Sequence, residues 1–308
     1  MTNQPLPPKF DLAAFSRIAN HPSHNPEDFA RMNHYGPLLA PVFYKKFGEG
    51  ERCACLIQRN SPILMVAHVD TVLQVDGRAP VLDGNRLFHP GMDNRMGVYL
   101  GLEVIPAMNL HVDLLLTTDE EQGASTSALV RTRKRYKWIF SFDRKGDDVV
   151  CYQYDNPELY RILTDSGFSV GQGSYSCITE MEHMECCGIN FGCGMADYHS
   201  DSAYCDLLQL TQQLQRFSQF YGQYADLWFP HTPAGQQSRR TIGHPWAENA
   251  ESILWQYEFH RSNGSTAAAD KAKEHLWKLL SYSPELRGVL AAEMAQFPEL
   301  IPELPVRT

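Results

Sequence analysis

Four short apolar runs stand out along a chain that otherwise mixes polar and apolar positions. They show little alternation with polar residues, which is typical of strands that are buried on both faces of a sheet. These runs cover residues 62–67, 112–117, 138–142 and 188–192. A shorter apolar run covers 53–58, and 81–88 predicts a hairpin whose turn is Asp83-Gly84-Asn85.

Segments with helical features lie between these runs and after them. They predict helices over 11–19, 97–107, 156–165 and 202–224. Asp11 would cap the first of these helices, and Pro157 would lie in the first turn of the third. Because predicted strands and helices alternate along the chain, we expect a layered α/β domain.

The pattern changes after residue 225. Residues 226–250 contain Pro-His and His-Pro steps with little periodicity, so they predict a loop or linker. Three helix-like segments follow, at 248–261, 267–280 and 284–297. We therefore expect a catalytic domain over residues 1–225 and a mainly helical C-terminal extension over 226–308.

Composition narrows the class of protein. The 308 residues carry 27 Lys and Arg against 36 Asp and Glu, a formal net charge of −9, which argues against a nucleic-acid partner. No apolar run is long enough to span a membrane, and the N-terminus lacks the pattern of a secretory signal. The eight cysteines include no CxxC pair, so we expect buried reduced thiols in a cytoplasmic protein.

Acidic and imidazole side chains gather at the ends of the predicted strands. His68 and Asp70 directly follow the first run, and residues two apart on an extended chain face the same side, so Asp70 could orient His68 as a metal ligand. A plain His-Asp hydrogen bond would explain the same pair. Asp93 precedes the helix-like segment that begins near residue 97, where it could equally be a helix cap.

Three further clusters follow the other strands. The second apolar run is followed by Asp119, Glu120 and Glu121. Three consecutive carboxylates repel one another unless a cation or a proton offsets the repulsion. A solvated acidic loop is the alternative. Asp143 follows the third run, and His199 follows the fourth. Two imidazoles among several carboxylates suit Zn²⁺, or Mn²⁺ or Co²⁺.

These clusters, in their order, resemble the motif set of the zinc-dependent exopeptidase superfamily, which includes aminopeptidases, carboxypeptidases and deacylases. The matching motifs are His68-Val69-Asp70, Gly91-Met92-Asp93-Asn94, Asp119-Glu120-Glu121, Asp143 and His199-Ser200. The resemblance covers roughly residues 55–210. It implies a mixed sheet sandwiched by helices, of the phosphorylase/hydrolase-like kind, and a pair of metal ions.

The resemblance also implies a role for each site residue. His68 and Asp143 would hold one metal ion, Glu121 and His199 the other, and Asp93 would bridge the two. Asp70 would orient His68, and Glu120 would be the general base and acid. The family pattern further implies a cis peptide bond between Asp93 and Asn94.

The chain departs from the family pattern in several places. The 55 residues between Asp143 and His199 are too few for the separate lid or dimerisation domain of many relatives, so we expect no lid-domain insertion. Asn94 stands where the family often has Asp, and Asp201 is the only acidic residue shortly after His199.

Several other residues are weaker candidates for the site. The oxyanion-stabilising histidine of related enzymes has no clear counterpart, and the candidates for its role are His183, Tyr175 and Tyr198. Arg144 and Lys145 could bind a substrate carboxylate, although a solvated turn is the simpler interpretation. His89 could line the site or cap the hairpin.

The predicted function is a di-zinc metallopeptidase that removes terminal residues from peptides, in the manner of an aminopeptidase. A deacylase of N-acyl amino acids is an alternative that uses the same metals. A metal-stabilised binding or assembly module without turnover is an alternative of another class. The predicted partner is a peptide or small amide, with no nucleic acid and no membrane, and the sequence is compatible with a homo-oligomer.

Overall fold

A computed structural model describes residues 9–34, 44–152, 154 and 156–231, together with the helical positions 254, 257, 261, 266, 269, 270, 273 and 276. The chain divides into two compact units, Met1–Thr232 and Pro233–Thr308. Seven of these eight helical positions fall in two of the three helices expected for the extension, at 248–261 and 267–280. The third, at 284–297, lies outside the described residues.

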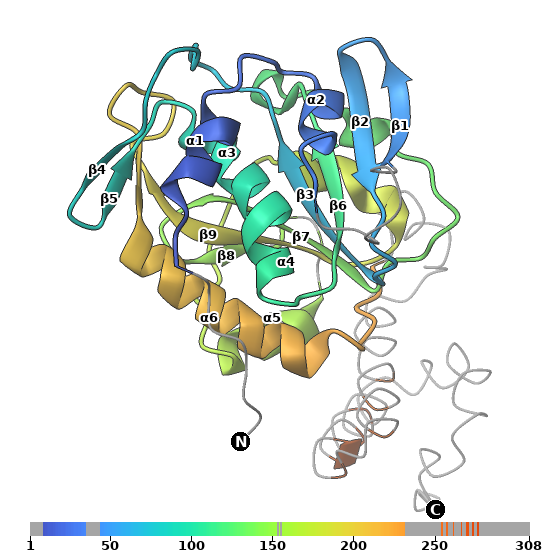
Figure 1. The fold of residues 1–308 in the computed structure, drawn as a ribbon. Helices are drawn as coiled ribbons and strands as arrows, with labels where there is room; N and C mark the ends of the chain where they lie inside the picture. The colour runs from blue at the N-terminus through green and yellow to red at the C-terminus, as the bar shows by residue number, and fades with distance from the viewer. Residues whose placement is uncertain are drawn as a thin grey trace, which may run out of the picture. The chain divides into compact units, whose positions relative to one another are not determined.

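A mixed sheet organises the first unit (Figure 1). Four parallel strands form its centre, in the order β6, β3, β7, β9. They are β3 (Ile63–His68), β6 (Asp113–Thr117), β7 (Trp138–Lys145) and β9 (Gly188–Ala196). The four apolar runs of the sequence are these strands. The residues of β3 and β6 are all buried, as expected for strands with neighbours on both sides and covered faces.

Shorter antiparallel strands extend the sheet at both edges. On one side lie β1 (Tyr44–Glu49) and β2 (Arg52–Ile57); on the other lie β10 (Tyr204–Asp206), β5 (Arg86–Phe88) and β4 (Val81–Asp83). The two-residue strand β8 (Val149–Val150) pairs with β9. The predicted hairpin is confirmed as β4 and β5, and Gly84 in its turn has a φ of 57°.

The helices follow the expected caps. Asp11 accepts a hydrogen bond from the Ala14 amide and begins α1 (Leu12–Ala19), and Asn156 caps α5 (Pro157–Asp165). A short α2 (Pro26–Ala30) lies between α1 and β1.

Two of the predicted helices have different bounds in the structure. The helix expected from residue 97 begins earlier, as α3 (Met92–Tyr99), and continues through a π-helical stretch (Leu100–Val104) into α4 (Ile105–Ala107).

The helix expected over 202–224 is α6 (Leu207–Tyr224), and its predicted start was wrong. Tyr204–Asp206 instead forms β10, between β5 and β9. The Asp206 carboxylate accepts hydrogen bonds from the amides of Leu208 and Gln209, which fixes the beginning of the helix after the strand.

Aromatic side chains join α6 to the sheet. Phe217 of α6 packs against Phe140, Phe142 and Phe191, with ring centroids 4.7–5.2 Å apart. The π-helical stretch after α3 packs closely on the sheet at Gly101, where a Cβ would lie 2.7 Å from the Leu114 side chain. Figure 1 shows α3, α4 and α6 lying across the strands. A second core cluster, which includes Leu64, Leu115, Ile178 and Met181, contains a 3₁₀ segment (Cys177–Met184).

The chain between Asp143 and His199 forms the end of β7, then β8, α5, the 3₁₀ segment and β9. All of these elements belong to the first unit, so the expected absence of an inserted lid domain agrees with the fold. Residues 226–231, which the sequence placed in the extension, are bonded to this unit as well. The Phe229 amide donates to Lys137 O, and its carbonyl accepts from the Cys187 amide.

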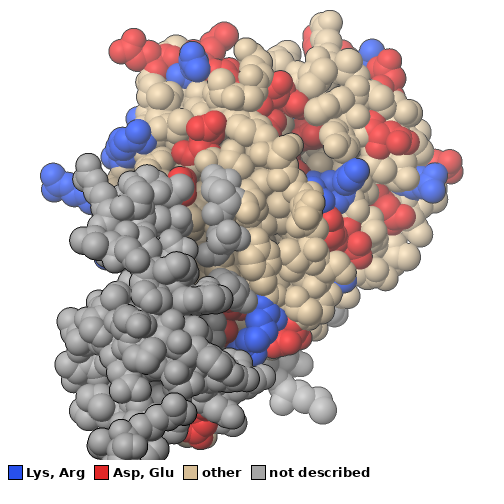
Figure 2. Space-filling model, turned by 180° about the vertical axis from the view of Figure 1, so that it is seen from behind, with Lys and Arg blue, Asp and Glu red and all other residues tan. Residues whose placement is uncertain are grey.

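Among the described residues, no helix has the length and apolar character needed to cross a membrane. On the face seen in Figure 2, acidic and basic side chains are interspersed among other residues over the described part of the chain.

The aromatic cluster allows a test of the core. Phe217→Ala should lower the free energy of unfolding by about 3–5 kcal/mol, because it leaves a cavity among large rings. Leu208→Ala on the same helix is the control: Leu208 is 54% exposed, so its loss should change stability by less than ~0.5 kcal/mol. Urea denaturation followed by tryptophan fluorescence measures both. Equal effects would contradict the packing described.

Candidate metal centre

The carboxyl ends of the central parallel strands bring the predicted site residues together. His68 ends β3, Asp143 lies in β7, Glu120 and Glu121 follow β6, and His199 follows β9. Asp93 lies in the first turn of α3. Ligand sites of α/β sheets form beyond these strand ends, where side chains that are distant in the sequence become neighbours.

His68 is completely buried, and its ring lies between several carboxylates. Its Nε2 atom is 3.2 Å from Asp93 Oδ1 and 3.3 Å from Asp143 Oδ1. Its other nitrogen, Nδ1, lies 3.1 Å from the Asp70 carbonyl oxygen and 3.4 Å from Asp70 Oδ1. With Asp70 on the Nδ1 side, the imidazole presents Nε2 to the cluster, which is the arrangement expected of a metal ligand.

Asp93 faces both histidines with different oxygens. Its Oδ1 lies beside His68, whereas its Oδ2 lies 3.2 Å from His199 Nε2. One carboxylate shared in this way could bridge two neighbouring cations. The Asp93–Asn94 peptide bond is cis, as the resemblance implies, and Asn94 Oδ1 accepts a hydrogen bond from the Gly97 amide.

Glu121 and His199 form the other side of the cluster. Glu121 Oε2 is 2.9 Å from His199 Nε2, and the Glu121 amide donates to Asp70 Oδ2. Asp119 and His199 both adopt left-handed backbone, with φ of 63° and 61°. Residues with a Cβ seldom adopt this conformation. Here it marks the sharp turns that follow β6 and β9.

Glu120 lies on the His68 side, with Oε2 3.6 Å from His68 Nε2. Ligand atoms of His68, Glu120 and Asp143 all lie within 4.8 Å of one another, and so do those of His68, Asp93 and Glu121. Distance alone therefore allows Glu120 as a ligand as well as a base. Asp93 lies between the two histidines, which favours one metal site at His68 and Asp143 and another at His199 and Glu121.

The cluster is electrostatically crowded. Burial raises the pKa of Asp143 well above its ordinary value, and it raises the pKa of Glu121 to about 7 and that of Glu120 in the same direction. Although burial opposes it, hydrogen bonds to His199 and His68 hold the pKa of Asp93 below its ordinary value. Buried carboxylates this close together need protons or a cation to offset their repulsion.

The residues present fit divalent metal ions. One buried carboxylate oxygen in each of Asp70, Glu121 and Asp143 lacks a hydrogen-bond partner. The free oxygens of Glu121 and Asp143 could therefore bind a cation. Separations of 2.9–3.3 Å between nitrogen and oxygen are close to the edge of a tetrahedron whose centre lies about 2.0–2.1 Å from each ligand. Imidazole and carboxylate together suit Zn²⁺, Mn²⁺ or Co²⁺.

The cluster opens into a pocket of about 610 Å³. Tyr175 and Tyr198, two of the predicted candidates, line it. Sequence reasoning missed Tyr152 and Ser174 in the wall. Gln172 and Gly173, which sequence reasoning also missed, line the pocket as well. The glycine at position 171 could have indicated this wall, because a side chain there would collide with the Arg144–Asp148 pair.

Other candidates are engaged elsewhere. His183 Nε2 lies 2.9 Å from the Val130 carbonyl oxygen, and His183 does not line this pocket. Asp201 is 73% exposed and forms an ion pair with Arg78. His89 is buried and supports the loop before α3: its Nδ1 accepts from the Gly91 amide, and its Nε2 lies 3.0 Å from Asn20 Oδ1. His89 therefore supports the loop before α3 and does not line this pocket.

Solved structures with a similar fold include an aminopeptidase and a tripeptidase. The chain superposes on aminopeptidase PepT from Bacillus cereus with a TM-score of 0.50 and 10% identity, over 68% of this chain and 96% of that one. A tripeptidase from Staphylococcus aureus gives a TM-score of 0.50 and 10% identity, over 70% and 97%. No protein-family model and no curated sequence matches the chain. The likeness confirms the fold expected from the resemblance to zinc-dependent exopeptidases.

The position of Asp93 between His68 and His199 leads to a prediction about metal content. Asp93→Asn should lower bound zinc from about two ions per chain to one or fewer, because the amide offers one neutral oxygen where the carboxylate offers two charged ones. Elemental analysis after dialysis against zinc and removal of the excess measures this.

The matched control is Asp201→Asn, which alters an exposed carboxylate outside the cluster and should retain the wild-type content. A folded Asp93→Asn variant that keeps two ions would rule out the bridging position.

Proposed function

We propose that this protein is a metal-dependent amide hydrolase of the exopeptidase kind, acting on short peptides in the manner of an aminopeptidase. The observation that carries the proposal is the position of Asp93, whose two oxygens face His68 and His199 separately. This arrangement suits two metal ions side by side, with Glu120 beside them. The pocket of about 610 Å³ is within the range of small-molecule sites, which supports a short substrate.

The residues would divide the work as follows. His68 and Asp143 would hold one ion, Glu121 and His199 the other, and Asp93 both. When bound, the ions would lower the pKa of a water molecule and polarise the scissile carbonyl. Asp70 would keep the His68 ring in the orientation that presents Nε2.

Glu120 is placed to move the proton. It lines the pocket and lies beside His68, and the described residues provide its carboxylate with no hydrogen bond, so it remains available to a water molecule. Burial raises its pKa, and a raised carboxyl pKa improves a group that must both accept and return a proton near neutral pH. Glu120 would take a proton from water and deliver it to the leaving nitrogen.

Glu120→Gln should lower kcat by about 10²- to 10⁴-fold, because the amide cannot accept the proton, while the metal content stays unchanged. Rates of dipeptide hydrolysis and elemental analysis of the same samples measure both. Glu49→Gln on the exposed strand β1 is the control and should behave as wild type. A metal-loaded Glu120→Gln enzyme with full activity would remove Glu120 from the mechanism.

The same assay separates the alternatives. Hydrolysis of dipeptides and aminoacyl amides supports an exopeptidase, whereas hydrolysis of N-acetyl amino acids alone supports a deacylase. Stoichiometric metal with no hydrolysis of either class would replace the enzyme with a metal-stabilised binding module.

A further inference from the structure

A second pocket adjoins the candidate metal centre. It also has a volume of about 610 Å³, and it shares Lys145, Met195 and Tyr198 with the pocket that contains the metal cluster. Its other walls come from the turn after β7, the end of β9, β10 and the beginning of α6. A substrate that reaches the metal cluster thus has room beyond the scissile bond, and Lys145 lies where the two spaces meet.

Several of the charged groups around this junction already have partners. Arg144 is bound by Asp148 through two contacts, at 2.5 and 2.7 Å, and donates to the Gln172 carbonyl. Asp147 pairs with Arg216 at 3.0 Å. Asp206 is occupied in capping α6.

Lys145 differs from these groups. Its side chain is exposed and forms neither a hydrogen bond nor an ion pair with any described residue, including Asp197, the remaining carboxylate of the second pocket. Lys145 and Arg144 are the only Lys or Arg residues that line either of these pockets among the described residues. Because Arg144 is already neutralised, Lys145 alone offers an uncompensated positive charge to a ligand.

The position of Lys145 along β7 suits a particular ligand group. It lies two residues beyond Asp143, so the two Cα atoms are about 6–7 Å apart on a strand. In a dipeptide or an N-acyl amino acid, only the nitrogen and one carbon separate the scissile carbonyl from the free carboxylate, a span of under about 4 Å. The flexible stem of Lys145 can cover the difference.

We propose that Lys145 binds the free carboxylate of the residue that leaves, and that the preferred substrates carry this carboxylate directly beside the scissile amide. This inference rests on the proposed hydrolase function. It narrows the substrates to dipeptides and similar compounds that end at the leaving residue. The ammonium group of Lys145 would attract such an anion and hold it beside the scissile amide.

The test compares a dipeptide with its C-terminal amide, for instance Leu-Gly with Leu-Gly-NH₂. The wild type should favour the free acid by about tenfold in kcat/KM, because a charged hydrogen bond at an exposed position is partly screened by solvent. In Lys145→Met this ratio should fall to about one, mainly through a higher KM for the acid. Lys145→Arg should restore part of the preference for the free acid. Added salt should lower the acid-to-amide ratio of the wild type, because it screens the charge of Lys145.

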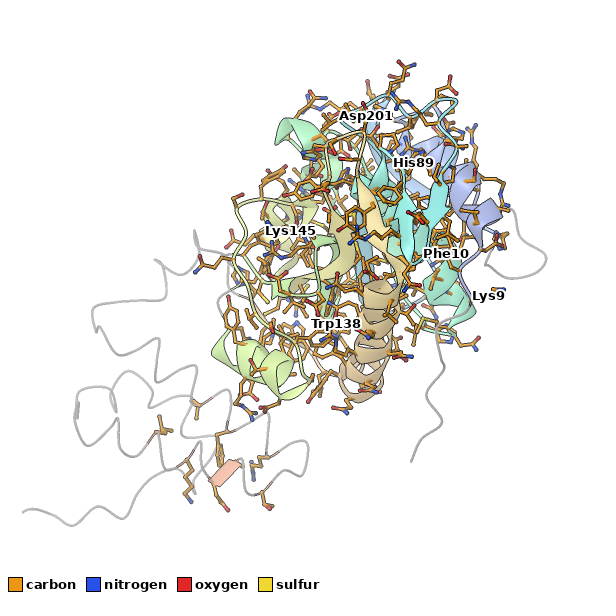
Figure 3. All side chains as sticks on the ribbon, turned by 90° about the vertical axis from the view of Figure 1, so that its left-hand side faces the viewer. Lys9, Phe10, His89, Trp138, Lys145 and Asp201 are labelled. Atoms are coloured by element: carbon orange, nitrogen blue, oxygen red, sulfur yellow. The ribbon has the colours of Figure 1, made fainter. Side chains whose placement is uncertain are left out.

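Lys9→Met is the matched control, since Lys9 is another exposed lysine. Figure 3 shows the two lysines on opposite sides of the molecule. The control should keep the wild-type ratio. A wild-type enzyme that does not distinguish acid from amide, or a Lys145→Met variant with an unchanged ratio, would overturn the inference.

Binding measured by calorimetry keeps this test independent of turnover. If the metal-loaded wild type hydrolyses neither compound, the proposed function fails, but the inference remains testable. Leu-Gly that binds about tenfold more tightly than its amide, with the difference lost in Lys145→Met, would still support it. Equal affinity for both compounds would refute it.

Discussion

The constraint on which the rest of this structure depends is the mutual repulsion among buried carboxylates. Asp93, Glu120, Glu121 and Asp143 share a small space with His68 at the carboxyl edge of the parallel strands. Burial raises the pKa of Asp143, Glu120 and Glu121, which shows how unfavourable their simultaneous ionisation is without a cation. A fold that keeps these groups together needs protons or cations to offset their repulsion, and a rigid frame to maintain the arrangement.

That frame lies in the loop before α3 and in the first turn of this helix. Burial lowers the pKa of His89 to about 4, so the ring stays neutral and can both donate and accept hydrogen bonds around Gly91. Arg95, fully buried, donates to the carbonyl oxygens of Ile18 and Ser23 and lies over the Phe29 ring. These contacts anchor the turn that carries Asp93 to the N-terminal helices, which explains why residues far from the chemistry would control the geometry of the bridge.

Local patterning explains what could be predicted. Each buried strand is a continuous apolar run, and the site residue follows directly at its end, as His68 does. The strands, and the edge of the sheet at which their end residues meet, could therefore be predicted from the sequence. The pairing of Asp93 with His199 came from the resemblance, because no local pattern joins residues so far apart. Strand β10 and the pocket wall at Tyr152 were missed for a related reason: both depend on neighbours from distant parts of the chain.

The departures from the family pattern have physical meaning as well. Asn94 stands where the family often has Asp, but its Oδ1 serves to accept the Gly97 amide, for which an amide oxygen is sufficient. The exchange removes a negative charge from beside a crowded cluster while keeping the hydrogen bond that shapes the turn. Asp201, by contrast, is exposed and paired with Arg78, so it lies outside the cluster. Under the proposed function, Glu120 would transfer the proton, because Asp93, Glu121 and Asp143 would hold the metal ions.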